Sequence, residues 1–370
     1  MQFIDLSKQQ SLIKNKINSR IQTVLKHGHY IMGPEVFEFE KNLKVFTGVN
    51  EVISCANGTD ALTLVLKAWN VSKGDAVYIP SFTYVASAEA ACILGATPVF
   101  VDVNYSTFNM DYKSLEKSIE NSKKLNLTPK AIIPVDLFGQ PADYNNIIKI
   151  AKEYKIKTLI DSAQSFGASY NGKRVGSFGD ACITSFFPAK PLGCYGDGGA
   201  VFTNDQELSD IIKSLRFHGK GTDKYDHVKV GMNSRLDTIQ SAILLEKLKI
   251  FEDEIQKRNE VAKIYSKYLK PIVDIPTIIE GVKSVWAQYT IKHPQRDRLQ
   301  KFLKKENIPT AIYYPKALSK QEAYNSYRVF HEKKMVSEKL SKCVLSLPMH
   351  PYLEKNDQES IISAIEKFHV

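Results

Sequence analysis

One lysine, Lys190, has a sequence context that would make it a nucleophile. It lies in the apolar, Gly- and Pro-rich segment 185–193, just before the glycine-rich run 196–200. Desolvation in such a segment disfavours the ammonium form and lowers the pKa of a lysine. A neutral amine can attack an aldehyde and form a Schiff base. The segment therefore predicts covalent chemistry at Lys190, against the background that most lysines are surface residues.

Asp161 supplies a second chemical group. Segment 155–160 has the composition of a buried strand, and Asp161 stands at its carboxyl end. Ligands of open α/β sheets bind outside the carboxyl ends of the strands. A carboxylate there can keep a pyridine nitrogen protonated, which pyridoxal phosphate needs to act as an electron sink, and Gln164 can hydrogen-bond a ring hydroxyl. Asp161 alone could equally be a helix cap or turn residue, but together with Lys190 it favours the cofactor.

The segment 54–62 predicts an anion site. It leaves a short apolar strand, turns at Gly58 and opens an amphipathic helix, whose first N–H groups are free to bind a phosphate. Many strand–Gly–helix turns exist in doubly wound folds, so this signal is weak alone. With Lys190 and Asp161 it provides the phosphate cradle that the cofactor requires, and the Ser185 hydroxyl is a further donor.

These segments, with several others, resemble the DegT/DnrJ/EryC1/StrS family of nucleotide-sugar aminotransferases. The resemblance runs from about residue 3 to segment 346–351 and covers nearly the whole chain. The further matching segments are 33–36, 57–62, 80–86, 98–103, 138–143, 161–164, 176–180, 218–219 and 233–237. So many ordered motifs make an accidental similarity very improbable.

The resemblance implies the aspartate-aminotransferase fold (fold type I), an α/β architecture with a mostly parallel seven-stranded sheet. Residues 1–254, including a helical N-terminal segment, are expected to form the large PLP-binding domain, and residues 255–370 a smaller α+β domain. The alternation of strands and helices independently favours a covered parallel sheet. Apolar residues at helical spacing from Leu244 to Leu269 predict one long helix that bridges the two domains.

The resemblance also implies roles for residues near Lys190. Lys190 would form the Schiff base, Asp161 would pair with the pyridine nitrogen, and Gln164 with the ring oxygen. Tyr84 matches an aromatic residue that stacks on the cofactor, although ordinary core packing would also explain it. The residues that match phosphate contacts are Gly58, Thr59 and Ser185.

Other implied roles involve a second subunit and the substrate. Asn233 matches a residue that reaches the cofactor phosphate of the partner, which implies a homodimer with both sites at the interface. Arg235 would hold a carboxylate or phosphate of a substrate, the alternative being a structural ion pair with Asp237 or another acid. Tyr313 and Tyr314 would contact the sugar.

The substrate expected from the resemblance is a UDP-linked 3-keto-2-acetamido hexose or hexuluronate, aminated by L-glutamate. Segment 186–199 is most similar to such enzymes, but those that accept the uronate tend to carry His-Tyr where this chain has Tyr313-Tyr314. An unoxidised or 6-deoxy 3-keto or 4-keto sugar, on UDP or dTDP, therefore stays open. Either product would serve a surface polysaccharide such as a lipopolysaccharide O-antigen, or a glycoconjugate.

Composition limits the remaining classes. The 370 residues carry a formal net charge of +10, but the lysines are scattered, and no nucleic-acid-binding module is recognisable. The five cysteines lack metal-ligand or redox spacing, which indicates no metal site and a reducing, cytoplasmic compartment. No signal peptide is expected at the N-terminus, and the most apolar stretch, 84–101, contains Glu89 and Pro98, so no membrane span is expected.

Two rival functions remain. A PLP-dependent sugar dehydratase is an offshoot of the same family, but it carries histidine in place of the Schiff-base lysine, so Lys190 opposes that assignment. A non-catalytic regulator would not need the intact set of Lys190, Asp161 and Gln164.

Overall fold

A central seven-stranded sheet organises the molecule, as expected from the sequence. The structure, a computed structural model, describes residues 1–223, 225–327 and 335–369. The strand order is β1-β9-β8-β5-β4-β2-β3, and only β9 runs antiparallel to its neighbours. The strands are β1 (Glu51–Cys55), β2 (Asp75–Pro80), β3 (Thr97–Val101), β4 (Thr128–Ile132), β5 (Lys157–Asp161), β8 (Ala181–Ser185) and β9 (Gly199–Thr203).

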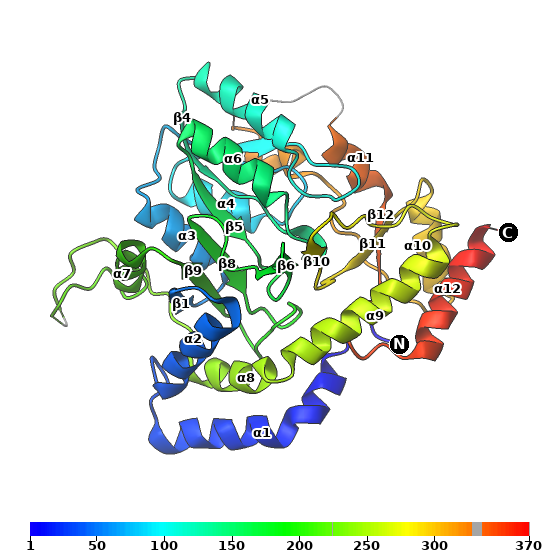
Figure 1. Cartoon of the computed structure of the whole chain (residues 1–370), viewed down its shortest axis with the longest axis horizontal. Helices are drawn as coiled ribbons and strands as arrows, with labels where there is room; N and C mark the ends of the chain where they lie inside the picture. The colour runs from blue at the N-terminus through cyan, green and yellow to red at the C-terminus, as the bar shows by residue number, and fades with distance from the viewer. Residues whose placement is uncertain (224, 328–334, 370) are drawn as a thin grey trace.

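Helices cover both faces of this sheet, which explains why its strands are mostly apolar. All residues of β2 and β9 are buried. One face packs against α3 (Gly58–Ala68), α4 (Ala86–Ile93) and α7 (Gln206–Leu215). The other face packs against α2 (Pro34–Thr47), α5 (Tyr112–Lys123), α6 (Tyr144–Tyr154) and α8 (Thr238–Leu248) (Figure 1). The result is a three-layer α/β core whose strand ends are free to form a site.

The expected long helix after Asn233 is two helices, so that prediction is wrong. α8 ends at Leu248, and α9 (Phe251–Leu269) starts after a break at Lys249 and Ile250. The two helices have different surroundings: α8 is buried between the sheet, α2 and α1 (Leu6–His27), whereas α9 continues toward the C-terminal part (Figure 1). Both helices bury apolar residues next to the break, so the helical spacing of apolar residues continues across it. The sequence pattern therefore gives no sign of the break.

The C-terminal part has its own apolar cluster. Tyr265, Tyr289, Leu299, Leu345 and Ile361 are among its buried residues. The elements are β11 (Tyr289–Lys292), α10 (Arg296–Lys305), α11 (Val336–Cys343), β12 (Val344–Leu347) and α12 (Lys355–His369), with 3-10 turns at Leu318–Lys320 and Glu322–Tyr324. The predicted division between residues 254 and 255 falls inside α9 and stays a prediction.

Smaller elements complete the chain. A three-stranded sheet joins β6 (Ser169–Tyr170), β7 (Lys173–Arg174) and β10 (Val282–Lys283), and a 3-10 turn spans Leu137–Gly139. Residues 217–223 and 225–233 belong to an arm that projects from the body beside α7 (Figure 1). Among the described residues, no helix has the length and apolar character needed to cross a membrane.

Candidate active site

Lys190 lies in the connection between β8 and β9, at the carboxyl end of β8. Its backbone N–H donates to the carbonyl of Phe187 (2.8 Å), which closes a tight turn. The side chain is partly buried. Burial lowers the pKa of the Lys190 ammonium, and the charge of Asp161 opposes this effect. The turn thus holds an amine whose neutral form is favoured, as nucleophilic chemistry requires.

Asp161 ends β5, the strand that pairs in parallel with β8, so it reaches the same edge of the sheet as Lys190. Its side chain is buried, and its two oxygens accept hydrogen bonds from Ala163 N (3.1 Å) and Ser87 Oγ (2.9 Å). Burial raises the pKa of Asp161 despite these bonds, and Lys190 lowers it. Each oxygen keeps a lone pair, so the carboxylate can still accept a proton-bearing ring nitrogen.

Gln164 is oriented by the fold around it. Its Oε1 accepts a hydrogen bond from Phe138 N (2.8 Å), and its Nε2 donates to the Tyr314 hydroxyl (3.3 Å). The second Nε2 proton stays available for a ring oxygen. The Tyr314 ring also lies 6.3 Å from the ring of Tyr84, which is 58% exposed. The structure therefore brings Asp161, Gln164, Tyr84 and Tyr314 together around Lys190.

A cradle for an anion lies beside these groups. Asn57 caps α3 by accepting a hydrogen bond from Asp60 N (2.8 Å). Gly58 approaches Ser185 so closely that an added Cβ would lie 2.9 Å from the Ser185 Cβ. A side chain here would force a shift, so the glycine lets Ser185 lie against the first residue of α3, with its hydroxyl oxygen 3.4 Å from the same Cβ position. Free N–H groups and a hydroxyl at a helix N-terminus are suited to a phosphate.

Taken as a set, these groups fit pyridoxal 5′-phosphate. An amine of lowered pKa, a buried carboxylate, an amide donor, an exposed tyrosine ring and a phosphate cradle surround one strand edge. Each is a group that a different part of this cofactor needs. The fit rests on donor chemistry and on the close approach of Gly58 to Ser185.

Asn233 and Arg235 lie on a segment that packs beside the turn between β1 and α3, but neither has a recorded contact with Lys190, Asp161 or Gln164 among the described residues. Asn233 is exposed at the base of the arm, and neighbouring Ser234 accepts a hydrogen bond from Ala56 N (3.2 Å). The Arg235 guanidinium lies 4.8 Å from the centroid of the Phe217 ring. Within the described ranges, Arg235 forms no ion pair with Asp237 or another acid. Neither side chain joins the groups around Lys190 in the same chain.

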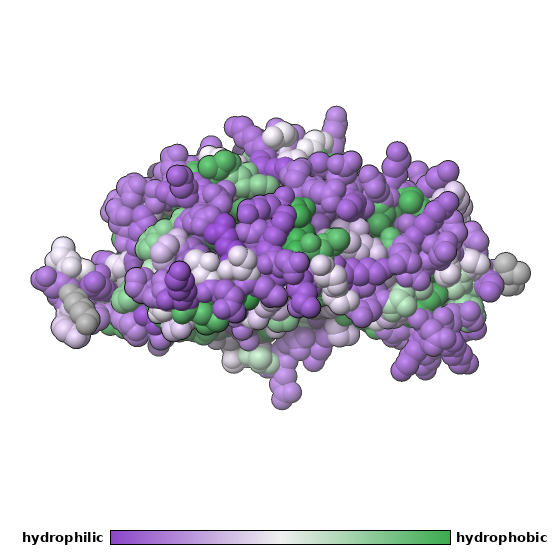
Figure 2. All heavy atoms as spheres, turned by 90° about the horizontal axis from the view of Figure 1, so that it is seen from below, coloured by the Kyte–Doolittle hydropathy of each residue, from purple (hydrophilic) through white to green (hydrophobic). Residues whose placement is uncertain are grey.

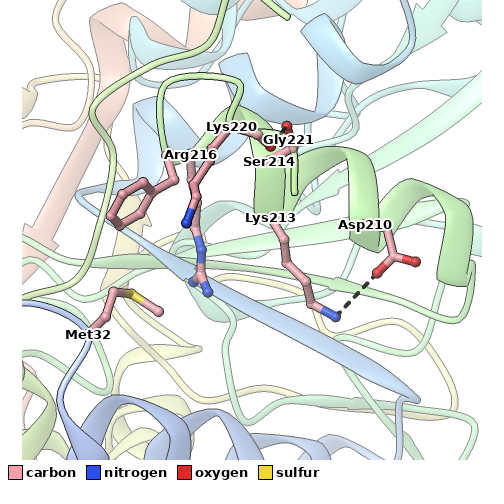
Figure 3. Close-up of a pocket in the computed structure, with 8 residues that line it drawn as sticks. Met32, Asp210, Lys213, Ser214, Arg216, Lys220 and Gly221 are labelled. Atoms are coloured by element: carbon pink, nitrogen blue, oxygen red, sulfur yellow. Dashed lines mark hydrogen bonds and ion pairs between the residues drawn. The ribbon is translucent and has the colours of Figure 1, made fainter. Parts of the chain in front are cut away.

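A hollow of about 350 Å³ lies at the base of the arm, and Met32, Arg216, Phe217 and Lys220 are among the residues that line it. Figure 3 shows Met32, Arg216 and Lys220 around it. Most of its charges are already engaged. Arg216 donates to Glu40 (2.7 Å), and Lys213 pairs with Glu51 (2.8 Å). It contains none of the residues around Lys190, so we assign no chemistry to it.

Sequence reasoning missed two residues that support the site. Ser87 donates to Asp161, as described above. Asp136 is fully buried next to the turn after β5, where it accepts hydrogen bonds from Ser165 Oγ and Tyr144 OH, each 2.5 Å, and from Ala142 N. Burial raises the pKa of Asp136 to about 7. Asp136 follows the carboxyl end of β4. Asp161 was predicted because it stands at the carboxyl end of a strand, and the same argument could have identified Asp136.

Comparisons with known proteins agree with this geometry. The model of the DegT/DnrJ/EryC1/StrS aminotransferase family matches residues 11–366. A "UDP-2-acetamido-2-deoxy-3-oxo-D-glucuronate aminotransferase" of Pseudomonas aeruginosa is 50% identical, with 99% of both chains covered. A "dTDP-3-amino-3,6-dideoxy-alpha-D-galactopyranose transaminase" of Aneurinibacillus thermoaerophilus is 39% identical, also with 99% of both covered. The crystal structure of a family member from Brucella abortus superposes with a TM-score of 0.98 at 51% identity, covering 100% of this chain and 99% of that one.

Proposed function

This chain belongs to the DegT/DnrJ/EryC1/StrS aminotransferase family and is a PLP-dependent sugar aminotransferase, and we propose that it transfers the amino group of L-glutamate to the 3-keto group of a UDP-linked 2-acetamido hexose. The observation that carries this substrate is the 50% identity, over the full length, to the enzyme from Pseudomonas aeruginosa. The arrangement of Lys190, Asp161 and Gln164 at one strand edge supports the chemistry.

Lys190 has two tasks in this proposal. Its amine would hold the cofactor covalently between turnovers, and the free amine would take the proton from the Cα of the amino donor. A lysine can serve as a general base near neutral pH only when its pKa is lowered. The burial of Lys190 has that effect, and the turn at Phe187 keeps the amine at the strand edge.

Asp161 and Gln164 orient and tune the cofactor ring. Bound PLP supplies an electron sink for the electrons left at Cα, provided that its ring nitrogen keeps a proton. The Asp161 carboxylate, fixed by Ser87 and Ala163, would hold that proton by charge attraction. Gln164, fixed by Phe138 and Tyr314, would donate to the ring oxygen.

The phosphate would be held by Gly58, Thr59 and Ser185 at the N-terminus of α3. The positive end of the helix dipole and its free N–H groups favour an anion there. Tyr84 would lie on the ring face, where its exposed side chain is free to stack. Arg235, Tyr313 and Tyr314 are proposed as contacts of the nucleotide sugar.

We further propose a homodimer whose sites combine both chains. Asn233 is exposed, as a residue that serves the partner should be. Large apolar side chains are exposed in several places, including Tyr30, Ile31, Val228 and Val230. Figure 2, which views the molecule from below, shows apolar patches between hydrophilic side chains on that face. Obligate homodimer interfaces bury such apolar surface.

A dTDP-linked 3-keto-6-deoxy hexose is the second candidate substrate. The 39% identity to the transaminase of Aneurinibacillus thermoaerophilus favours it, and so does Tyr313, which brings no positive charge for a sugar carboxylate. With either sugar, the product would enter a surface polysaccharide. All five cysteines are free thiols, which suits the reducing cytoplasm that we propose as its location.

The test separates the two half-reactions. Purified holoenzyme mixed with L-glutamate should release 2-oxoglutarate and lose the visible absorbance of its lysine-linked cofactor. UDP-linked 3-amino-2-acetamido sugars and dTDP-linked 3-amino-6-deoxy sugars are then supplied as substrates of the reverse reaction. Faster turnover of the UDP sugars is expected. Turnover of the dTDP sugars alone would establish the second candidate, and no conversion by glutamate would reject glutamate as the donor.

A further inference from the structure

The N-terminal segment, residues 1–5, lies against the C-terminal part of the chain. The Phe3 carbonyl accepts a hydrogen bond from Met349 N (3.3 Å). Asp5 caps α1 by accepting from Ser7 N and Lys8 N, each 3.0 Å. Lys8 in turn pairs with Glu354 (2.6 Å). Figure 1 shows the N-terminus beside α9 and α12. The backbone of Phe3 is therefore held independently of its side chain.

A row of aromatic rings connects this segment to the active site. The ring of Phe3 lies 6.3 Å from the ring of Tyr313, and Tyr313 lies 5.8 Å from Tyr314. Tyr314 in turn accepts the hydrogen bond from Gln164. Phe3 is thus two ring contacts away from Tyr314, a residue that touches the site, although the two are more than 300 residues apart in sequence.

Tyr313, the middle ring of this row, packs against a cluster of apolar side chains. Phe3 is partly buried, and so is Tyr313. Desolvation alone raises the pKa of Tyr313, with no contribution from a charged neighbour. Aromatic faces of this kind bind the apolar side of a sugar or a methyl group, and would not stabilise a bare carboxylate.

Substrate size decides which ligand can use this surface. Both amino donor and sugar must place their reacting carbon at Lys190. L-glutamate is short and ends in a charged carboxylate, whereas a nucleotide sugar extends much farther from its reacting carbon. Only the larger substrate needs contacts beyond the groups that surround Lys190.

We propose that Phe3 and Tyr313 form a wall that binds an uncharged part of the nucleotide sugar and takes no part in binding the amino donor. Phe3 is then a specificity-determining residue of the second half-reaction alone. This inference rests on the proposed function, because it assumes a sugar acceptor.

The test is Phe3→Ala, with each half-reaction measured separately on the full-length holoenzyme. The glutamate half-reaction should stay within about twofold of wild type. The value of kcat/KM for the UDP-3-amino-2-acetamido sugar in the reverse direction should fall by about tenfold or more, as is usual when an apolar contact is lost from a substrate pocket. The backbone bond to Met349 survives the substitution, so the segment should stay docked.

Two further variants exclude a merely structural effect. Phe3→Leu keeps an apolar side chain and should recover part of the loss. Leu6→Ala removes an exposed apolar side chain at the first residue of α1, directly after this segment, and should change neither half-reaction. Equal losses in both half-reactions of Phe3→Ala, no loss in the sugar half-reaction, or the same pattern in Leu6→Ala would each overturn the proposal. If the wild type itself failed with the sugar, the proposed substrate would fail, not the role of Phe3.

Discussion

The strand edge at Lys190 and the arm at residues 217–223 and 225–233 differ in how far one chain completes them. At the strand edge, Asp161 and Gln164 each have fixed partners, and the cradle at Gly58 touches Ser185. On the arm, Val230 is 83% exposed and Asn233 is open to solvent. The groups of the first region are fixed by contacts within the chain. These side chains of the second region are exposed to solvent in a single chain.

This difference indicates that the strand edge carries the chemistry and that the arm takes part in assembly. Groups that must be oriented to a fraction of an ångström are placed on strand ends and locked by buried hydrogen bonds. Groups that act across an interface can stay exposed until a partner covers them. We therefore expect substitutions at the strand edge to remove chemistry, and substitutions on the arm to weaken assembly.

The largest effect is expected for Lys190→Ala at the strand edge. Loss of the amine removes both the covalent anchor and the base, so turnover should fall about 10⁴-fold or more in both half-reactions. Steady-state assays with glutamate and the keto sugar measure this loss, and circular dichroism checks that the fold persists. Near wild-type turnover would show that another residue has the role assigned to Lys190.

Asp161→Asn should have the next largest effect. The amide keeps the size and a hydrogen bond but lacks the charge that would hold a proton on the ring nitrogen. The glutamate half-reaction, followed by stopped-flow absorbance, should slow by about 10²- to 10³-fold while the cofactor stays bound. An unchanged rate would mean that the carboxylate does not tune the ring.

The sequence predicts those features of the site that depend on local patterns. It does not predict contacts between segments that are distant in the chain. Lys190, Asp161 and Gly58 could be found because strand, turn and helix signals are local and strand ends share one edge. The bonds from Ser87 to Asp161 and from Phe138 to Gln164 join distant segments, and nothing local marks them. The break at Lys249 and Ile250 was hidden for the same reason, since packing on α1 and α2 decides it.

On the arm, Val230→Asp should weaken the dimer. A charge at a position that an interface covers would be left without a partner, so the concentration for half-dissociation should rise about tenfold to a hundredfold. Sedimentation velocity over a dilution series measures this. Val45→Asp on α2, where the valine is 80% exposed, is the matched control. Equal effects of both variants, or none, would remove the arm from the interface.

An effect on stability, and not on turnover or assembly, is expected at Asp136, behind the strand edge. Its folded-state pKa, raised to about 7 by burial, means that the native state binds the proton more tightly than the unfolded state. The stabilisation is complete below the ordinary carboxyl pKa and is lost as the pH rises to about 7. The free energy of unfolding of wild type relative to Asp136→Asn should therefore fall by on the order of 1 kcal/mol per pH unit in this window. Urea titrations at several pH values measure it, and a flat difference would contradict the raised pKa.

The most direct test of the central claim, that the strand edge of one chain and the arm base of the other form one site, is a mixed dimer of Lys190→Ala and Asn233→Ala chains. Each variant alone should be severely impaired. In a mixed dimer, the intact Lys190 of one chain meets the intact Asn233 of the other. Co-expression should therefore restore about a quarter of wild-type activity, since half the dimers are mixed and each has one intact site. Activity no higher than the average of the two parents would show that each chain completes its own site.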